Sequence, residues 1–277
     1  MKKTILVVGG SGTVGAEIIR QLKAEGHVVR ATTGKKSDSK EKVEVNLLTG
    51  EGLKQAFEGI DRAFFLSPAG YANQYQVLSP LIQEAKRRGL EKVVLMTAMG
   101  ANAGDTPMRR AEIELEKSGL TYNILRPNWF LQNFNTFWVQ GIREQGKILV
   151  PGGTAKVSFI DTRDVSAVAA RLLVSDELKN RDFDLTGPEA VDHDQVASAL
   201  SEVSGKRITY SDVQPEPFKQ GLLQAGLPED YSDFLLLIFG FLRQGYAANV
   251  NNNVREIIGR SPIGVQKYAA ENKQAWL

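Results

Sequence analysis

Short runs of apolar residues alternate along the first half of the chain with segments whose apolar residues recur at helical spacing. Runs of about four apolar residues are typical of strands buried on both faces of a parallel sheet. Such runs stand at Ile5–Val8, Ala63–Leu66, Val93–Met96 and Tyr122–Leu125, with weaker ones at Val28–Thr33 and Val43–Leu47.

The segments between these runs have the apolar stripes of amphipathic helices. The stripes are formed by Val14, Ile18, Ile19 and Leu22; by Val77, Leu81, Ile82 and Ala85 before Gly89; and by Ala111 and Leu115 before Gly119. A glycine directly after such a stripe is a common helix end. This alternation predicts an α/β fold with a doubly wound parallel Rossmann sheet.

After about residue 128 the alternation changes. The aromatic segment Trp129–Trp138 is followed by predicted strands at Val157–Ile160 and Phe183–Leu185, which we expect to return to the sheet on either side of a helix at Val165–Val174. From residue 188 the chain is mostly helical in pattern, with breaks expected at Pro215, Pro217, Pro228 and Pro262.

These patterns predict two domains. Residues 1–187 would form the dinucleotide-binding domain, with residues 129–150 contributing to the substrate cleft. Residues 188–277 would form a small, mostly helical substrate lobe across the carboxyl ends of the strands, where ligands bind in open α/β sheets.

The strongest chemical signal is the glycine-rich loop between the first strand and the first helix. Its glycines fit two overlapping spacings, which share Gly12 and Gly15 and begin at Gly9 or Gly10. The first glycine allows a tight turn, the second lets the backbone approach a pyrophosphate, and the third lets the helix pack closely. A glycine-rich turn that binds nothing is the alternative, but the strand before it and the amphipathic helix after it favour a nucleotide site. The predicted pyrophosphate contacts are Gly9, Gly10, Ser11, Gly12, Thr13, Val14 and Gly15.

The end of the second strand indicates which cofactor binds. A site that prefers NAD usually has an Asp or Glu there, which binds the ribose 2′-hydroxyl. This chain has no acidic residue after that strand until Asp38, whereas Thr33, Lys35 and Lys36 could accommodate a 2′-phosphate. The two lysines could instead only solvate a loop. We predict NADPH as the cofactor, with NADH as the second choice.

Composition excludes several other classes of protein. The net charge is only +2, with 34 Lys and Arg among 32 Asp and Glu, so no basic stripe for nucleic acid is indicated. Apolar stretches such as Phe234–Gly240 are far shorter than a membrane span, and no signal-peptide pattern is present. We expect a cytoplasmic protein with no membrane partner.

The chain has no cysteine and only two histidines, which limits its chemistry. Disulfides, thiol nucleophiles and thiolate metal ligands are excluded. His27 and His193 lie far apart in the sequence and do not have the short spacing that is typical of metal ligands, so no metal site is predicted. We expect both histidines to have solvated, structural roles.

Several segments together resemble one known family. Beside the glycine loop they are Ser67-Pro68, Ser118–Pro127, Val157–Val165, Phe183–Pro188 and Ser198–Lys206. They look like the NmrA-like group of atypical short-chain dehydrogenases/reductases, over almost the whole chain. Within the group the chain is most similar to NADPH-dependent quinone oxidoreductases and triphenylmethane reductases, and more distantly to NmrA regulators and isoflavone-type reductases.

The resemblance implies further cofactor contacts. Asn46 and Leu47 would lie by the adenine, Ser67, Pro68 and Ala69 along the ribose and phosphates, Thr97 by the nicotinamide ribose, and Pro127, Asn128 and Phe130 at the nicotinamide. The chain departs from the pattern twice here. Asn46 stands where many relatives have Asp, and Gly34 stands where they commonly have Arg, which leaves a 2′-phosphate to Lys35 or Lys36.

A third departure concerns catalysis. Typical members of the wider superfamily use Tyr-x-x-x-Lys, in which the phenol donates a proton and the lysine lowers its pKa. Those positions fall on Gly104 and Met108, which cannot transfer a proton, so no catalytic residue is predicted. A quinone or an extended dye can take a hydride and gain its proton from solvent. We therefore predict a reductase of a flat, aromatic or quinoid acceptor.

The predicted acceptor pocket uses the aromatic segment. Trp129, Phe130, Phe134 and Phe137 would supply an apolar wall, and Asn128, Gln132 and Asn133 would orient polar groups. Phe134 and Phe137 could equally pack the lobe. Tyr71 could approach the substrate, without a catalytic role.

Two other functions compete with the reductase. The chain could be a non-catalytic NAD(P)-binding redox sensor that acts through a protein partner, since missing proton-transfer residues fit that role equally well. Epimerisation of nucleotide sugars ranks last because it needs the same Tyr and Lys. An exposed helix pair could support a homodimer.

Overall fold

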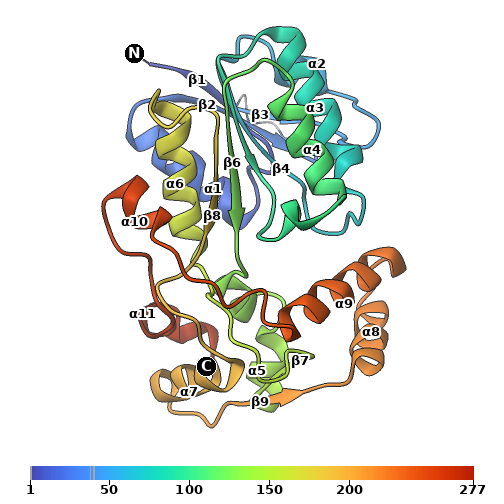
Figure 1. Cartoon of the computed structure of the whole chain (residues 1–277), viewed down its shortest axis with the longest axis vertical. Coiled ribbons are helices and arrows are strands. Elements are labelled where there is room, and N and C mark those ends of the chain that lie inside the picture. The colour runs from blue at the N-terminus through green and yellow to red at the C-terminus, as the bar shows by residue number, and fades with distance from the viewer. Residues whose placement is uncertain (1, 38, 40) are drawn as a thin grey trace. The chain divides into compact units, whose positions relative to one another are not determined.

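A computed structural model describes residues 2–37, 39 and 41–277 of the chain (Figure 1). Asp38, the first acidic residue after the second strand, lies outside the described residues. The chain forms two compact units, and each is described by itself. The first comprises Met1–Pro127 and Arg163–Asp184, and the second comprises Asn128–Thr162 and Leu185–Leu277.

The first unit contains a seven-stranded sheet in the order β3-β2-β1-β4-β5-β6-β8. Its strands are β1 (Thr4–Val7), β2 (Val28–Thr33), β3 (Lys42–Glu44), β4 (Arg62–Leu66), β5 (Lys92–Met96), β6 (Tyr122–Pro127) and β8 (Arg181–Leu185). The neighbours from β3 through to β6 pair in parallel, and the strand order reverses between β1 and β4. The predicted doubly wound parallel sheet is therefore confirmed.

Helices cover both faces of this sheet. They are α1 (Thr13–Ala24), α2 (Leu53–Ala56), α3 (Gln74–Arg88), the 3-10 turn η1 (Ala101–Ala103), α4 (Pro107–Glu116) and α6 (Thr162–Val174). Figure 1 shows α1 and α6 on one face and α2, α3 and α4 together on the other. The predicted apolar stripe of α3 is fully buried, because Val77, Leu81, Ile82 and Ala85 are each 0% exposed.

The second unit has its own core and a small sheet. Its elements are η2 (Leu131–Asn135), α5 (Val139–Gln145), β7 (Lys147–Val150), α7 (His193–Ser204), β9 (Thr209–Asp212), α8 (Pro215–Gln224), α9 (Glu229–Arg243), α10 (Asn253–Ile258), α11 (Val265–Glu271) and η3 (Lys273–Ala275). The sequence did not predict β7 and β9, which pair in parallel as a two-stranded sheet. The core gathers Leu131, Phe134, Phe159, Leu200 and Trp276 around these elements.

Two of the predicted strands differ in the structure. Val157–Ile160 is buried but forms only isolated bridges within the second unit, with Val191 and with Phe130, so its predicted return to the large sheet is wrong. The third strand is Lys42–Glu44 rather than Val43–Leu47. It ends early because the Asn46 side-chain oxygen accepts hydrogen bonds from the amides of Leu48 and Thr49, which turns the chain.

Two of the expected proline breaks fall in the first turn of a single helix. Pro215 is the first residue of α8, and Pro217 lies in the same first turn. Proline is well tolerated there because the first helical amides have no partner within the helix to lose. Pro228 stands at the N-cap of α9, and Pro262 lies between α10 and α11.

The predicted solvated role of His193 is wrong. His193 is 0% exposed and lies among aromatic rings, stacked on Tyr210 at 5.0 Å and edge-on to Phe159 at 5.5 Å. Neither ring nitrogen has a hydrogen-bond partner among the described residues. Burial lowers the pKa of His193 to about 4, against the opposing charges of Asp192 and Asp212.

The buried His193 should make the stability of the protein fall as the pH falls from about 6.5 to about 4. An unfolded His binds its proton near pH 6.5, whereas folded His193 stays neutral down to about pH 4, so the unfolded state gains protons first. The shift corresponds to about 3 kcal/mol. Urea unfolding at a series of pH values measures this loss of unfolding free energy. His193→Leu is the control, because its pH dependence comes from all the other titratable groups. Parallel curves for the two proteins across this range would contradict the prediction.

Candidate functional site

The glycine loop between β1 and α1 has a backbone that only glycine permits at two positions. Gly9 has a φ of +74°, and its carbonyl accepts a hydrogen bond from the Gly12 amide at 3.0 Å. A Cβ atom on Gly15 would lie 2.3 Å from the Gly9 carbonyl oxygen, which no real contact permits. The loop is therefore folded tightly over the first turn of α1.

The first turn of α1 is suited to an anion. Its N-cap is Gly12, which has no side chain to satisfy the free amides, and no acidic residue stands in the turn. The first amides of a helix have no partner within the helix and carry a partial positive charge. On the other side of this turn, the Ser166 hydroxyl of α6 donates to the Val14 carbonyl at 3.1 Å and ties the two helices together.

The carboxyl ends of neighbouring parallel strands bring most of the predicted residues of the first unit to one edge of the sheet. Each group directly follows a strand or closes it: the loop after β1, Thr33 with Lys35 and Lys36 at β2, Asn46 and Leu47 after β3, Ser67, Pro68 and Ala69 after β4, Thr97 after β5, and Pro127 at β6. Ligands bind at this edge of open α/β sheets, beside the point of strand reversal.

The end of β2 is joined to the glycine loop and presents its lysines to solvent. The Gly9 amide donates to the Thr32 hydroxyl at 3.2 Å, and the Lys35 amide donates to the Thr33 hydroxyl at 3.2 Å. Lys35 and Lys36 are exposed, and neither forms an ion pair with any other described residue. Their ammonium groups are available to an anionic ligand.

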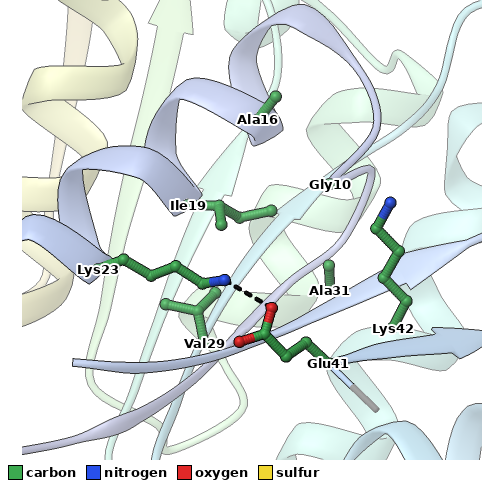
Figure 2. Close-up of a pocket in the computed structure, with 8 residues that line it drawn as sticks. All are labelled: Gly10, Ala16, Ile19, Lys23, Val29, Ala31, Glu41 and Lys42. Carbon is green, nitrogen blue, oxygen red and sulfur yellow. Dashed lines mark hydrogen bonds and ion pairs between the residues drawn. The ribbon is translucent and has the colours of Figure 1, made fainter. Parts of the chain in front are cut away.

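A hollow of about 170 Å³ lies beside the glycine loop, on the side where α1 packs on β2 (Figure 2). It is lined by Gly10, Ala16, Ile19, Lys23, Val29, Ala31, Glu41 and Lys42. A Cβ atom on Gly10 would point into this packing, 2.6 Å from the Cβ of Ala31. The ion pair between Lys23 and Glu41 at 2.6 Å spans the hollow. Gly10 is the only predicted cofactor contact in this lining, so we assign the hollow no part in the nucleotide site.

Thr97 belongs to a buried polar network that the sequence did not reveal. Its hydroxyl donates to Glu112 Oε1 of α4 at 2.6 Å. Arg126 of β6 binds the same carboxylate with two bonds, from Nε to Oε1 at 2.8 Å and from Nη2 to Oε2 at 2.9 Å. Arg109 adds a bond to Oε2 at 3.0 Å, and Arg126 also pairs with Asp182.

The network keeps Glu112 ionised although it is 0% exposed. Burial alone would raise the pKa of Glu112, but the hydrogen bonds from Arg126 and Thr97 outweigh it and lower that pKa from its ordinary value. The signal that could have revealed the network is a charged residue next to Ala111 and one turn before Leu115, on the buried stripe of α4.

The two positions predicted to replace the Tyr and Lys of the wider superfamily lie at the end of η1 and in the first turn of α4. Gly104 is exposed and ends η1, and Met108 lies half-buried in the first turn of α4. Tyr71 is half-buried in the loop before α3, where its backbone carbonyl accepts a hydrogen bond from the side-chain Nε2 of Gln74 at 2.8 Å.

In the second unit, the side-chain amides of Asn128 and Gln132 form hydrogen bonds within the protein. Asn128 donates both N–H bonds of its amide, to the Ser158 hydroxyl at 2.7 Å and to the Ala247 carbonyl at 2.8 Å. Gln132 donates to Asp161 Oδ1 and accepts from the Thr162 amide, both at 2.9 Å.

The aromatic residues of the second unit differ widely in exposure. Phe134 is 0% exposed and packs on Phe159 and Trp138, whereas Phe137 is 71% exposed. Trp129 is half-buried, with its ring centroid 4.7 Å from that of Phe239. Phe130 and Asn133, also half-buried, join by a bond from the Asn133 amide to the Phe130 carbonyl at 3.2 Å. The structure thus makes Phe134 a core residue.

Among the described residues, no helix combines the length and apolar character needed to cross a membrane. The same residues contain no group of three or more His, Cys, Asp or Glu placed to hold a metal ion.

Comparison with known proteins gives a consistent result. The model of the NmrA-like family matches residues 1–256, which confirms the resemblance seen in the sequence. The chain is 30% identical over 285 residues to an NAD(P)H azoreductase of Xenophilus azovorans, covering 98% of this chain and 99% of the relative.

Two solved structures share the fold. The triphenylmethane reductase of Citrobacter sp., complexed with NADP(H), is 20% identical with a TM-score of 0.81, covering 98% of this chain and 99% of that one. The negative transcriptional regulator NmrA, in complex with NADP, is 18% identical with a TM-score of 0.76, covering 99% of this chain and 96% of that one.

Proposed function

The chain belongs to the NmrA-like family, and from that premise we propose that it is an NADPH-dependent reductase of a flat, conjugated acceptor. One relative, 30% identical over nearly the full length of both chains, is an NAD(P)H azoreductase. The observation that carries the proposal is the fold of the glycine loop. Its backbone leaves no room for a side chain at Gly15, and the first turn of α1 that follows it contains no acidic residue.

The residues of the first unit fit a dinucleotide phosphate. The amides of Thr13 and Val14 would donate to the paired phosphates, as helix N-termini do in dinucleotide-binding folds. Lys35 and Lys36 would neutralise a 2′-phosphate, since no acidic residue is described between Thr33 and Ser37 that would repel it. When bound, NADPH would supply the hydride, and the protein would orient it and exclude water.

The acceptor class follows from the absence of a proton-donating side chain at positions 104 and 108. With Gly104 and Met108 where a phenol and an amine are expected, the acceptor would take its proton from water. Quinones, azo compounds and cationic dyes meet this condition, because hydride addition leaves an oxygen or nitrogen that solvent protonates, or a neutral product. The contribution of Trp129, Gln132 and Asn133 to an acceptor pocket stays a prediction.

Steady-state oxidation of NADPH tests the proposal, with a naphthoquinone, an azo dye and a triphenylmethane dye as acceptors. We expect turnover with at least one of them. One hydride and one proton from water would reduce a quinone to the hydroquinone or an azo dye to the hydrazo compound, and one hydride alone would reduce the cationic dye to its neutral form. Tight binding of NADPH with no turnover on any acceptor would contradict the reductase. That outcome would support a redox sensor, the role suggested by likeness to a transcriptional regulator that binds NADP.

Replacing both lysines after β2 should reduce the preference for NADPH. We expect Lys35→Ala/Lys36→Ala to weaken NADPH binding about tenfold and to leave NADH binding unchanged, because only NADPH carries the charge that these lysines would neutralise. Calorimetric titration of both coenzymes measures the effect. The control is Lys54→Ala, an exposed lysine of α2. Equal losses for both coenzymes would show that the lysines do not contact the 2′-phosphate.

A further inference from the structure

The ionised Glu112 determines the hydrogen-bonding direction of Thr97. An ionised carboxylate can only accept, so the hydroxyl at 2.6 Å must be the donor. A hydroxyl has one hydrogen to donate and two lone pairs to accept with. With its hydrogen committed to Glu112, the Thr97 oxygen can only accept from a ligand.

The carboxylate itself is held in place from three directions. Arg126 binds both of its oxygens, Arg109 binds Oε2, and Thr97 binds Oε1. Arg126 is 3% exposed and Glu112 is 0% exposed, so water does not compete for these bonds. The orientation of the Thr97 hydroxyl is therefore fixed before any ligand arrives.

Strand order places Thr97 on one half of the nucleotide edge. The glycine loop follows β1, which lies between β2 and β4, and Thr97 follows β5 on the far side of β4. A dinucleotide crosses the sheet edge at the strand reversal, with its pyrophosphate at the loop. Since the predicted adenosine positions follow β2 and β3, the other half of the ligand falls at β4 and β5.

We propose that Glu112 is a positioning residue, which holds Thr97 as a pure acceptor for a ribose hydroxyl on the nicotinamide half of the cofactor. The proposal deepens the proposed function and rests on it. A sugar hydroxyl can donate its hydrogen to Thr97, whereas a phosphate or carbonyl oxygen cannot. The arrangement therefore selects a ligand group that donates a hydrogen at this point of the sheet edge.

Calorimetry with NADPH and with 2′,5′-ADP, which lacks the nicotinamide ribose, tests the proposal. We expect Thr97→Val to weaken NADPH binding about fivefold, as the loss of one hydrogen bond implies, and to leave 2′,5′-ADP binding unchanged. Thr97→Ser, which restores the hydroxyl, should bind NADPH like the wild type. A merely structural role for Thr97 would weaken both ligands together, and that result would overturn the proposal.

A double-mutant cycle tests the part played by Glu112. Glu112→Gln should weaken NADPH binding about threefold, because an amide can also donate to Thr97 and the orientation of the hydroxyl is lost. The same change added to Thr97→Val should weaken it no further. An additional loss in the double variant would show that Glu112 does not act through Thr97. Glu84→Gln is the matched control, since Glu84 is a helix glutamate, 7% exposed and bound by Arg87 and Arg88.

The outcomes separate this proposal from the proposed function. If the wild type gives no heat with NADPH, both are overturned. If it binds NADPH and 2′,5′-ADP but Thr97→Val changes neither affinity, only the role of Thr97 and Glu112 is overturned. Thermal unfolding of each variant shows whether a change in affinity accompanies a change in fold.

Discussion

Gly15→Ala should lower the affinity for NADPH by at least about 100-fold and destabilise the first unit by about 1–3 kcal/mol. The added methyl group would lie 2.3 Å from the Gly9 carbonyl oxygen and 2.8 Å from the Gly9 carbonyl carbon. Both are backbone atoms, so no side chain can rotate away and the whole loop must move. Moving the loop displaces the amides that would bind the pyrophosphate. Calorimetric titration and urea unfolding measure the two effects.

Two further glycine variants separate binding from stability. A Cβ atom on Gly12 would come no closer than 3.4 Å to the Gly9 oxygen, an ordinary contact, so Gly12→Ala should fold normally yet block the approach of the phosphates. Gly221→Ala in α8 has no atom within 4 Å of the added methyl and should keep full affinity with a small gain in stability. Normal NADPH binding by both Gly12→Ala and Gly15→Ala would eliminate the loop as the pyrophosphate site.

The parts of the fold that the sequence predicted are those decided by local pattern. β1, β4, β5 and β6 form at the predicted apolar runs, and the glycine loop follows the first of them. Each of these features depends on residues within a few positions of one another, so they can be found without knowing what packs against them. The stripes of α1 and α3 belong to the same class.

Long-range pairing decided the features that the sequence did not predict. Val157–Ile160 has the apolar pattern of a buried strand, but its partners are Val191 and Phe130, and nothing within the segment specifies them. His193 looks like an ordinary polar helix start, and only the packing of Phe134, Phe159 and Tyr210 around it removes it from water. The same distinction holds within the candidate site. The glycine loop is a local motif that the sequence predicted, whereas the contact between Thr97 and Glu112 joins residues 15 positions apart and was not predicted.

Arg126→Met should destabilise the protein by about 3–5 kcal/mol, the cost of leaving a buried carboxylate without its main partner. Arg126 makes two bonds to Glu112, at 2.8 and 2.9 Å, and the remaining partners of that carboxylate are Thr97 and Arg109. Without the guanidinium, the largest of the interactions that lower the pKa of Glu112 is lost, while burial still acts to raise it. Urea unfolding at neutral pH measures the loss.

Two comparisons show whether the cost comes from the buried pair. Asp182→Asn removes another partner of Arg126 and leaves Asp184 at 3.7 Å, and because Asp182 is 54% exposed, this variant should lose no more than about 1 kcal/mol. Arg126→Met/Glu112→Leu removes both charges and should be more stable than Arg126→Met alone, because no uncompensated charge remains inside. If the double variant were as unstable as the sum of its two single variants, the loss would reflect packing rather than charge. The buried pair would then stabilise the protein by packing alone. The fixed orientation of the Thr97 hydroxyl, which we attribute to the charge of Glu112, would need another cause.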